Sequence, residues 1–484
     1  MTVVLSILFT AAGYLIGLAL VPKILVQRRE HGATIAWLLA IIFLPYVGAL
    51  LYWSIGGRRI RFRQRRRTRA IQLVAPGLAA STQCVRRFES TEPGATVHLP
   101  EPALALARIM DRLEKPSCSG NAVEVLLDAE ATFSRIHSAI ESAESHVHVE
   151  YYIWRNDETG RALRDVLVKV AKAGVEVRVL VDDVGSRQAD KKFFRPLLDA
   201  GGKVGRFLPV NLLARRLVIN HRNHRKIVVV DGRVAFTGGL NVGDEYFGRD
   251  PVAGRWRDTH LRIEGPGALR LQEVFVEDWA HATDKDLTAA KYFPDPVPSG
   301  DQRVHILTSG PDERHRSIAT VYFTGITLAR EKVWLTTPYF VPDPPLVAAL
   351  ETAALRGVDV RLLVPGKLDE PIILHAARSF YPELLAAGVH VYEYDDTAML
   401  HAKTATIDGC WSTIGTANLD LRSFYLNFEV NAVVYGSSVA RELERAFERD
   451  IATARRVELA EFGRSRPWKQ RAIEGAARLL SPLL

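Results

Sequence analysis

Cysteine is scarce in this sequence, with three residues in 484. Cys84, Cys118 and Cys410 are odd in number, and none belongs to a C-x-x-C pair. We therefore expect free thiols, and neither a disulfide framework nor a structural zinc site. The sequence also lacks a P-loop and any carboxylate–histidine cluster with metal-ligand spacing, so we expect no nucleotide cofactor and no metal ion.

Acidic residues are absent from the segment between Arg58 and Arg69, which holds eight arginines. The whole chain has a net charge of +8, so the remainder is close to neutral. The basic character belongs to one short segment and not to an extended surface. It gives no reason to expect a nucleic-acid partner.

Charge is also missing from two long apolar runs near the N-terminus. They cover 2–22 and 33–57, and each has roughly the 20 residues needed to cross a hydrocarbon core. We predict a two-helix transmembrane hairpin over residues 1–57. The alternative, a cleaved signal peptide followed by a buried helix, lacks the usual basic start. By the positive-inside rule, the arginine segment places everything after residue 58 in the cytoplasm, and it could also bind anionic lipid head groups.

After residue 120 the sequence repeats itself. Segment 173–181 reads AGVEVRVLV and segment 356–364 reads RGVDVRLLV, and short apolar strands are expected upstream at 147–152 and 333–340. A helix that ends near a glycine before a valine-rich strand is typical of an α/β unit with a buried sheet. We predict an α/β fold of two fused halves. The predicted domains are the hairpin 1–57, a basic juxtamembrane segment and linker 58–120, the halves 121–300 and 301–455, and a C-terminal tail 456–484.

Each half contains the pattern H-x-K-x4-D-x6-G-x2-N. Matching internal spacing in two repeats of one chain argues against coincidence, whereas a single H-x-K would carry little information. The residues predicted to form the site are His224, Lys226, Asp231, His401, Lys403 and Asp408, with Gly239, Asn241, Thr416 and Asn418 in support.

These residue types suit phosphodiester chemistry. Residues two apart in a strand face the same side, so each histidine and its lysine point together. The lysines supply positive charge to a transferring phosphoryl group, and the asparagines can donate hydrogen bonds to its oxygens. Gly238 and Gly239 would let the backbone approach that group closely. One imidazole can attack phosphorus while the other protonates the leaving alkoxide, which requires no metal.

Two H-x-K-x4-D motifs in one chain resemble the signature of the phospholipase D superfamily. The wider context resembles the bacterial cardiolipin synthases, and the similarity extends along nearly the whole chain. The matching segments are 220–227 (NHRNHRKI), 256–260 (WRDTH), 338–342 (PYFVP), 399–404 (MLHAKT), 422–429 (RSFYLNFE) and 479–484 (LLSPLL).

The resemblance implies that the two halves share one active site. It implies transfer of a phosphatidyl group between two phosphatidylglycerol molecules, giving cardiolipin and glycerol, in a bacterial inner membrane. Asp258 and Glu429 take the places of carboxylates that orient the histidines, in some relatives each serving the opposite half. Asp231 and Asp408 are then structural.

We expect His224 to be the nucleophile and His401 the acid and base. The motifs also fit a hydrolytic phospholipase D, a transferase with another alcohol acceptor, or a nuclease, although a membrane anchor argues against the last. A non-catalytic membrane scaffold should have lost motif residues. The sequence leaves the oligomeric state open. Segment 468–484 fits an interfacial membrane helix or a tail docked on the body. Further residues considered for the site are Glu150, Tyr152, His221 and His375.

Overall fold

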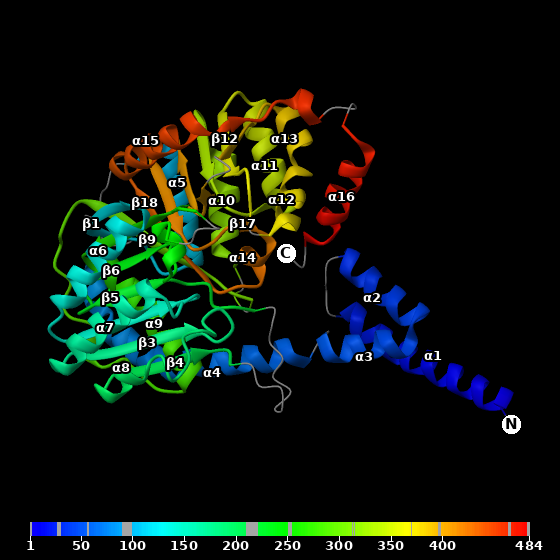
Figure 1. Ribbon diagram of the computed structural model, residues 1–484, viewed down its shortest axis with the longest axis horizontal. Helices are drawn as coiled ribbons and strands as arrows, with labels where there is room; N and C mark the ends of the chain where they lie inside the picture. The colour runs from blue at the N-terminus through cyan, green and yellow to red at the C-terminus, as the bar shows by residue number, and fades with distance from the viewer. Residues whose placement is uncertain are drawn as a thin grey trace. The chain divides into compact units, whose positions relative to one another are not determined.

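The computed structural model describes residues 2–26, 31–55, 58–89, 99–209, 221–249, 254–311, 313, 315–368, 370–394, 398–462 and 466–481 (Figure 1). Asn220 and residues 482–484, which belong to two of the matched segments, lie outside this part of the chain. The chain forms two compact units, Met1–Gln72 and Leu73–Leu484.

The first unit is helical. It consists of α1 (Thr2–Val26), α2 (His31–Phe43), α3 (Pro45–Ile55) and the beginning of α4 (Arg58–Ser81). The second apolar run is divided between α2 and α3 because Pro45 has no backbone N–H to continue α2 and fits the first turn of α3. A small core joins α1, α2 and α3 through Ile24, Ile41 and Tyr52.

Among the described residues, no helix combines the length and the apolar character that crossing a membrane requires. The predicted transmembrane hairpin is therefore not confirmed.

Helices also occupy part of the segment expected to be an irregular linker. These are the remainder of α4, η1 (Gln83–Phe88) and α5 (Glu101–Leu113). α5 buries Ala103, Leu106, Ala107 and Met110, which follow the i, i+3, i+4, i+7 spacing of an amphipathic helix. Pro102 does not break this helix because it lies in the first turn, where no N–H is needed.

One sheet of 15 strands runs through the second unit. From its centre outward, the first half contributes β1 (Cys118–Leu127), β8 (Thr259–Glu264), β6 (Val234–Gly238), β5 (Ile227–Val230), β2 (His146–Tyr151), β3 (Glu176–Asp182) and β4 (Lys203–Phe207). The second half contributes β9 (Gln302–Ser309), β18 (Glu429–Tyr435), β16 (Trp411–Gly415), β15 (Thr404–Ile407), β10 (Lys332–Thr336), β12 (Asp359–Pro365), β13 (His390–Tyr394) and β19 (Arg455–Arg456). Apart from β19, the two orders match strand for strand, as the sequence repeat predicts. The halves join where β1 pairs antiparallel with β9.

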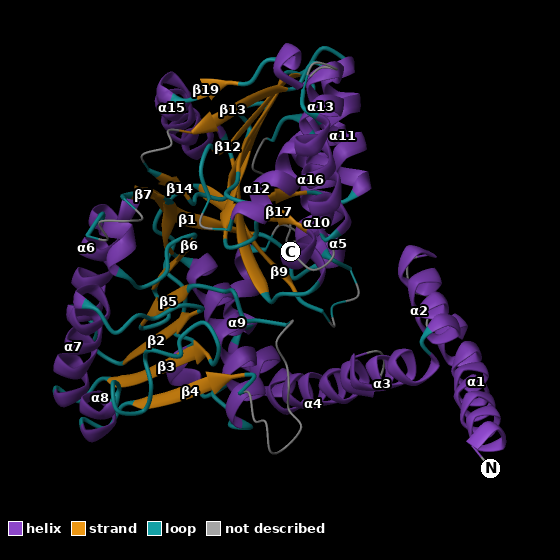
Figure 2. Ribbon diagram, turned by 45° about the vertical axis from the view of Figure 1, so that its right-hand side comes forward, coloured by secondary structure: helices purple, strands orange, loops and turns teal. Residues whose placement is uncertain are grey.

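Helices cover both faces of the sheet, and the two halves are covered in opposite senses. Figure 2 shows α7 and α15 on one side of the strands and α9 and α11 on the other. The helices are α6 (Asp128–Glu141), α7 (Glu158–Lys172), α8 (Arg195–Asp199), α9 (Pro266–Thr283), α10 (Ser317–Leu328), α11 (Pro344–Leu355), α12 (Pro371–Arg378), α13 (Tyr381–Ala387), α14 (Leu421–Tyr425), α15 (Ser437–Thr453) and α16 (Trp468–Leu479).

The apolar run of β5 is explained by burial on both of its faces. Ile227 and Val229 pack with side chains of α9, whereas Val228 and Val230 pack with side chains of α6 and α7. A strand buried on both sides reads as a continuous apolar run without alternation. The start of β5, and with it the first motif histidine, is thereby fixed in the interior of the unit.

Candidate active site

His224 lies just before β5 and is joined to the second half by its backbone. Its N–H donates to the Phe428 carbonyl oxygen at 2.9 Å. Because Phe428 directly precedes Glu429, this contact brings a carboxylate to the ring, and His224 Nδ1 lies 2.9 Å from Glu429 Oε2. The Thr416 hydroxyl donates to the same Oε2 at 2.6 Å, so the carboxylate is held from two sides.

His401 is held in the same way by the first half. β14 (Met399–Leu400) pairs in parallel with β7 (Trp256–Arg257), and the His401 N–H donates to the Arg257 carbonyl oxygen at 2.7 Å. Asp258 Oδ2 then lies 2.6 Å from His401 Nδ1, while Asp258 Oδ1 accepts from the Thr259 N–H at 2.7 Å. Each motif histidine is therefore oriented by a carboxylate of the opposite half.

Gly239 and Thr416 occupy equivalent positions, and both serve these carboxylates. A Cβ atom on Gly239 would lie 2.0 Å from Asp258 Oδ1. From the sequence we expected this glycine to admit a phosphoryl group, but the structure gives the space to the Asp258 carboxylate. In the other half the Thr416 hydroxyl supplies a hydrogen bond to Glu429.

The two motif lysines lie behind the histidines. Lys226 Nζ donates to the His224 carbonyl oxygen at 2.6 Å, and Lys403 Nζ donates to the His401 carbonyl oxygen and lies 3.0 Å from His401 Nδ1. Both lysines are buried. Burial lowers the pKa of Lys226 to about 7, a shift that Glu429 opposes and the Lys403 ammonium reinforces. A bound anion between the histidines would favour the charged form of both lysines.

Burial also governs the titration of the histidine–carboxylate pairs. It lowers the pKa of His224 against the effect of Glu429, and it lowers the pKa of His401 well below its usual range. Burial raises the pKa of Asp258 to about 6, whereas the pKa of Glu429 is lowered because its burial is outweighed by His224 and the adjacent lysine. Near pH 7 both rings are therefore mainly neutral, the form in which an imidazole nitrogen can attack.

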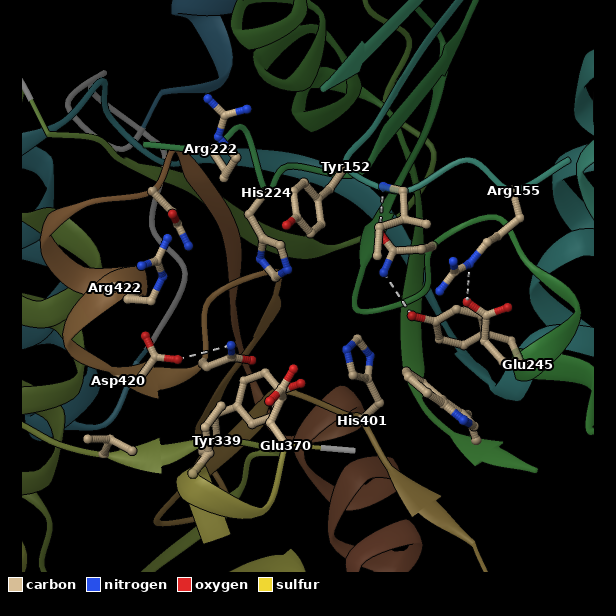
Figure 3. Close-up of a pocket in the computed structure, with 18 residues that line it drawn as sticks. Tyr152, Arg155, Arg222, His224, Glu245, Tyr339, Glu370, His401, Asp420 and Arg422 are labelled. Carbon is tan, nitrogen blue, oxygen red and sulfur yellow. Dashed lines mark hydrogen bonds and ion pairs between the residues drawn. The ribbon is translucent and has the colours of Figure 1, made fainter. Parts of the chain in front are cut away.

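A cavity of about 440 Å³ separates the two histidines. In Figure 3 both rings point into it, with Arg222 and Arg422 on the His224 side and Arg155 beside Glu245 on the other side. The Tyr152 ring centroid lies 4.9 Å from that of His224, and the Trp256 centroid lies 5.1 Å from that of His401. The lining further includes Ile153, Asn241, Glu245, Tyr246, Tyr339, Val341, Glu370, Ile373, Asn418, Asp420 and Asn427. This mixture of cationic, hydroxyl and apolar groups suits an anionic head group attached to an apolar body.

The motif aspartates lie at the far ends of their strands, away from this cavity. The Asp231 side chain accepts from the N–H groups of three successive residues, 144–146, which lead into β2. The Asp408 side chain accepts from those of residues 330–332, which lead into β10. Both aspartates have a left-handed backbone, with φ of 53° and 51°. They tie adjacent strands together and cannot reach a substrate between the histidines.

The motif asparagines line the cavity and already have protein partners. Asn241 Nδ2 donates to the Tyr246 hydroxyl at 2.8 Å, and Asn418 Nδ2 donates to Asp420 Oδ2 at 3.1 Å. Because a side-chain amide has two N–H donors, each can keep its protein contact and still donate one hydrogen bond into the cavity.

A buried polar network surrounds the first motif, and the sequence did not predict it. Asn223 Nδ2 donates to Glu150 Oε1 at 2.5 Å, and Arg225 pairs with Asp278 at 2.6 Å. Burial and the nearby Asp278 carboxylate raise the pKa of Glu150 well above its usual range. Strand position indicated that Glu150 points toward the site. Its partners Asn223 and Asp278 lie 73 and 128 positions away in the sequence, and no local pattern identifies them.

The other residues considered from sequence are placed as follows. Tyr152 lines the cavity, whereas His221 and His375 are not among its lining residues. His221 Nδ1 instead lies 3.0 Å from the Leu426 carbonyl oxygen. Within the described ranges, no group of three or more His, Cys, Asp or Glu side chains is placed to hold a metal ion.

Comparison with known proteins agrees with this geometry. The family described as "Cardiolipin synthase, PLD-like domain" matches residues 136–279 and 322–451, and "Phospholipase_D-nuclease N-terminal" matches residues 14–57. The cardiolipin synthase of Geobacillus kaustophilus is 41% identical over 465 residues, which cover 95% of this chain and 90% of that protein. The major cardiolipin synthase of Bacillus subtilis is 39% identical, with 95% of each chain covered.

A solved structure supports the fold independently. The crystal structure of phosphatidylserine synthase from Haemophilus influenzae superposes with a TM-score of 0.60 over 78% of this chain and 100% of that chain, at 16% identity. At this identity the likeness concerns the fold alone. The family is settled by the family model and the sequence relatives: the chain belongs to the cardiolipin synthases, with their phospholipase D-like domain.

Proposed function

We propose that this protein is a cardiolipin synthase that transfers a phosphatidyl group from one phosphatidylglycerol molecule to another, releasing glycerol. The proposal depends on one observation. His224 and His401 face the same cavity, and each is oriented by a carboxylate from the opposite half. Two similar bases on either side of one phosphorus suit a reaction in which one phosphodiester is broken and an equivalent one is formed.

In the first step, Nε2 of His224 attacks the phosphorus of the donor lipid. The bond from phosphorus to the glycerol head-group oxygen breaks, and His401, whose protonated form is favoured by the bound anionic lipid, gives its proton to that oxygen. Glu429 holds the Nδ1 proton of His224 and so keeps Nε2 available for attack. The two lysines stabilise the charge that develops on the equatorial phosphoryl oxygens.

In the second step the roles reverse. A glycerol hydroxyl of the acceptor phosphatidylglycerol loses its proton to His401 and attacks phosphorus, and the bond from phosphorus to His224 breaks. The donor ester bond is exchanged for an equivalent one, so no nucleotide is consumed. Asp258 stabilises the His401 imidazolium in each direction.

The substrates require membrane access. Homology to bacterial phospholipid-synthesising enzymes supports a membrane location, and the match of residues 14–57 to a family N-terminal segment supports an anchoring role for it. We propose that this segment forms a multi-pass anchor with the remaining chain in the cytoplasm, and that the domain boundaries fall near residues 58, 121, 301 and 456.

Lipid product analysis tests the function. Full-length protein is incubated with phosphatidylglycerol vesicles without nucleotide or metal, beside His224→Ala and His401→Ala. We expect cardiolipin and free glycerol, both lost in the two variants. Phosphatidic acid as the only product would identify a hydrolytic phospholipase D, and product formed only when serine or another alcohol is added would identify a different acceptor.

Trapping the phosphohistidine tests the histidine assignment. Labelled donor lipid and rapid acid-free digestion should place the phosphoryl group on the peptide that contains His224. A label on the His401 peptide would reverse the two roles.

A further inference from the structure

The C-terminal helix α16 has an exposed apolar face with basic residues beside it. Trp468 is 69% exposed, Ile473 52%, Leu479 82% and Leu480 41%. We call these four residues and Ala472 the α16 face. Single exposed apolar side chains are common, but several gathered on one side of a helix and flanked by polar residues mark a surface that contacts a membrane or another molecule.

The helix is nevertheless firmly seated on the body. Glu474 and Ala477 are buried, and Ala477 belongs to the large core of the second half. Glu474 pairs with Arg466 at 2.7 Å, and Arg478 pairs with Glu383 of α13 at 3.1 Å. The α16 face is therefore held in a fixed orientation, because the opposite side of the helix supplies the docking contacts.

The charges of α16 point to the kind of surface it contacts. Lys469 and Arg471 are exposed and have no ion-pair partner among the described residues. The only acidic residue of the helix, Glu474, is turned inward. A helix that presents Trp, Ile and Leu together with unpaired cations is suited to the boundary between lipid head groups and acyl chains of an anionic membrane.

The position of α16 connects this surface to the cavity between the histidines. α16 lies beside α12 (Figure 1), and α12 carries Ile373, which lines that cavity, while Glu370 lines it just ahead of the helix. α16 follows the second half, and among the described residues no corresponding helix lies between the first half and β9.

We propose that the α16 face lies in the head-group layer of an anionic membrane and holds this side of the active-site cavity at the lipid surface. The proposal rests on the proposed function, because that function supplies the lipid substrate. It adds a second contact with the membrane, distinct from the N-terminal segment.

Site-directed fluorescence on the full chain tests this contact without measuring turnover. Cys84, which is partly exposed, is replaced by serine, and a cysteine is introduced by Ala472→Cys for labelling with an environment-sensitive dye. The matched control is Leu355→Cys, because Leu355 is an apolar residue that is 74% exposed and lies at the end of another helix of the second half, α11. Vesicles of phosphatidylcholine alone are compared with vesicles that also contain phosphatidylglycerol.

We expect a dye at position 472 to gain about threefold in intensity and to be quenched by lipid-borne quenchers in the anionic vesicles, with little change at position 355. Adding Lys469→Glu and Arg471→Glu should abolish most of that gain. Equal signals at the two positions, no response to anionic lipid, or a gain that appears without vesicles as protein concentration rises would overturn the proposal. If the dye signal appears as expected but the unmodified protein makes no cardiolipin, the proposed function alone is contradicted.

Discussion

At the scale of single residues, Gly239 is a position where one added methyl group should disrupt the active site. An added Cβ would lie 2.0 Å from the Asp258 carboxylate that orients His401. We expect Gly239→Ala to displace that carboxylate and to lower kcat by about 100-fold, since a shift of ~1 Å in a reacting group costs that much. Transfer assays on vesicles measure the loss. Gly475→Ala is the control, because a Cβ there meets no atom within 4 Å. Equal activity in the two variants would show that the Asp258 position is not critical.

Lys226 has a pKa of about 7 and an unfolded value near 10.5, so the folded state binds its proton less tightly than the unfolded chain does. The lysine therefore lowers stability below pH 7, and the stability of the wild type rises between pH 7 and 10.5. We expect Lys226→Met to be inactive yet more resistant to urea at pH 6.5, with the difference shrinking by pH 9.5. A difference that stays constant with pH would mean that Lys226 is not the titrating group.

The motif residues were predictable because both halves repeat them at identical spacing. The roles of the residues that surround the motifs in the folded chain could not be predicted in this way. Glu150, Asn223 and Asp278 meet only after folding, and whether a carboxyl group is ionised depends on that three-dimensional environment. The same reason explains why the space beside Gly239 was assigned to a substrate and not to Asp258.

At the scale of secondary-structure elements, the two motif aspartates join strands. Asp408 accepts hydrogen bonds from three backbone N–H groups that lead into β10, and its φ is 51°. We expect Asp408→Ala to lower the free energy of unfolding by about 3 kcal/mol, because charged hydrogen bonds are lost and alanine is strained in the left-handed region. Asp408→Asn should cost about half as much, since asparagine keeps one acceptor and tolerates this φ. Urea unfolding compares the two.

Activity separates this structural role from a catalytic one. The folded fraction of Asp408→Asn should retain most of its transfer rate. A fully folded but inactive variant would indicate that Asp408 takes part in the chemistry.

Element boundaries depended on how proline was interpreted. From the sequence we assigned residues up to 120 to a linker, but α5 lies within it, and Pro102 falls in the first turn of that helix, where its missing N–H costs nothing. Pro45 was overlooked within an apolar run, yet it divides that run into two helices. The repeated valine-rich strands were predicted correctly because burial on both faces leaves a continuous apolar signal.

At the scale of the whole molecule, the two halves share more than a cavity. One apolar cluster contains Val229 of the first half together with Ile414 and Val430 of the second, and the sheet runs through both. The sequence repeat predicted two halves, but two similar α/β units could equally have been separate domains with a small interface. What the repeat could not reveal is the exchange of carboxylates, which makes each half incomplete without the other.

This arrangement predicts that the halves unfold together. Leu362 is fully buried in the second half, and Leu362→Ala should lower the free energy of unfolding by about 2–5 kcal/mol. If the shared core and sheet couple the halves, hydrogen exchange measured by mass spectrometry should accelerate to a similar degree in β12, which contains the substitution, and in β3, its counterpart in the first half. Faster exchange confined to β12 would show that the first half is stable by itself. The histidine–carboxylate pairs would then form at an interface between independently folded domains, and the catalytic geometry would depend on their docking.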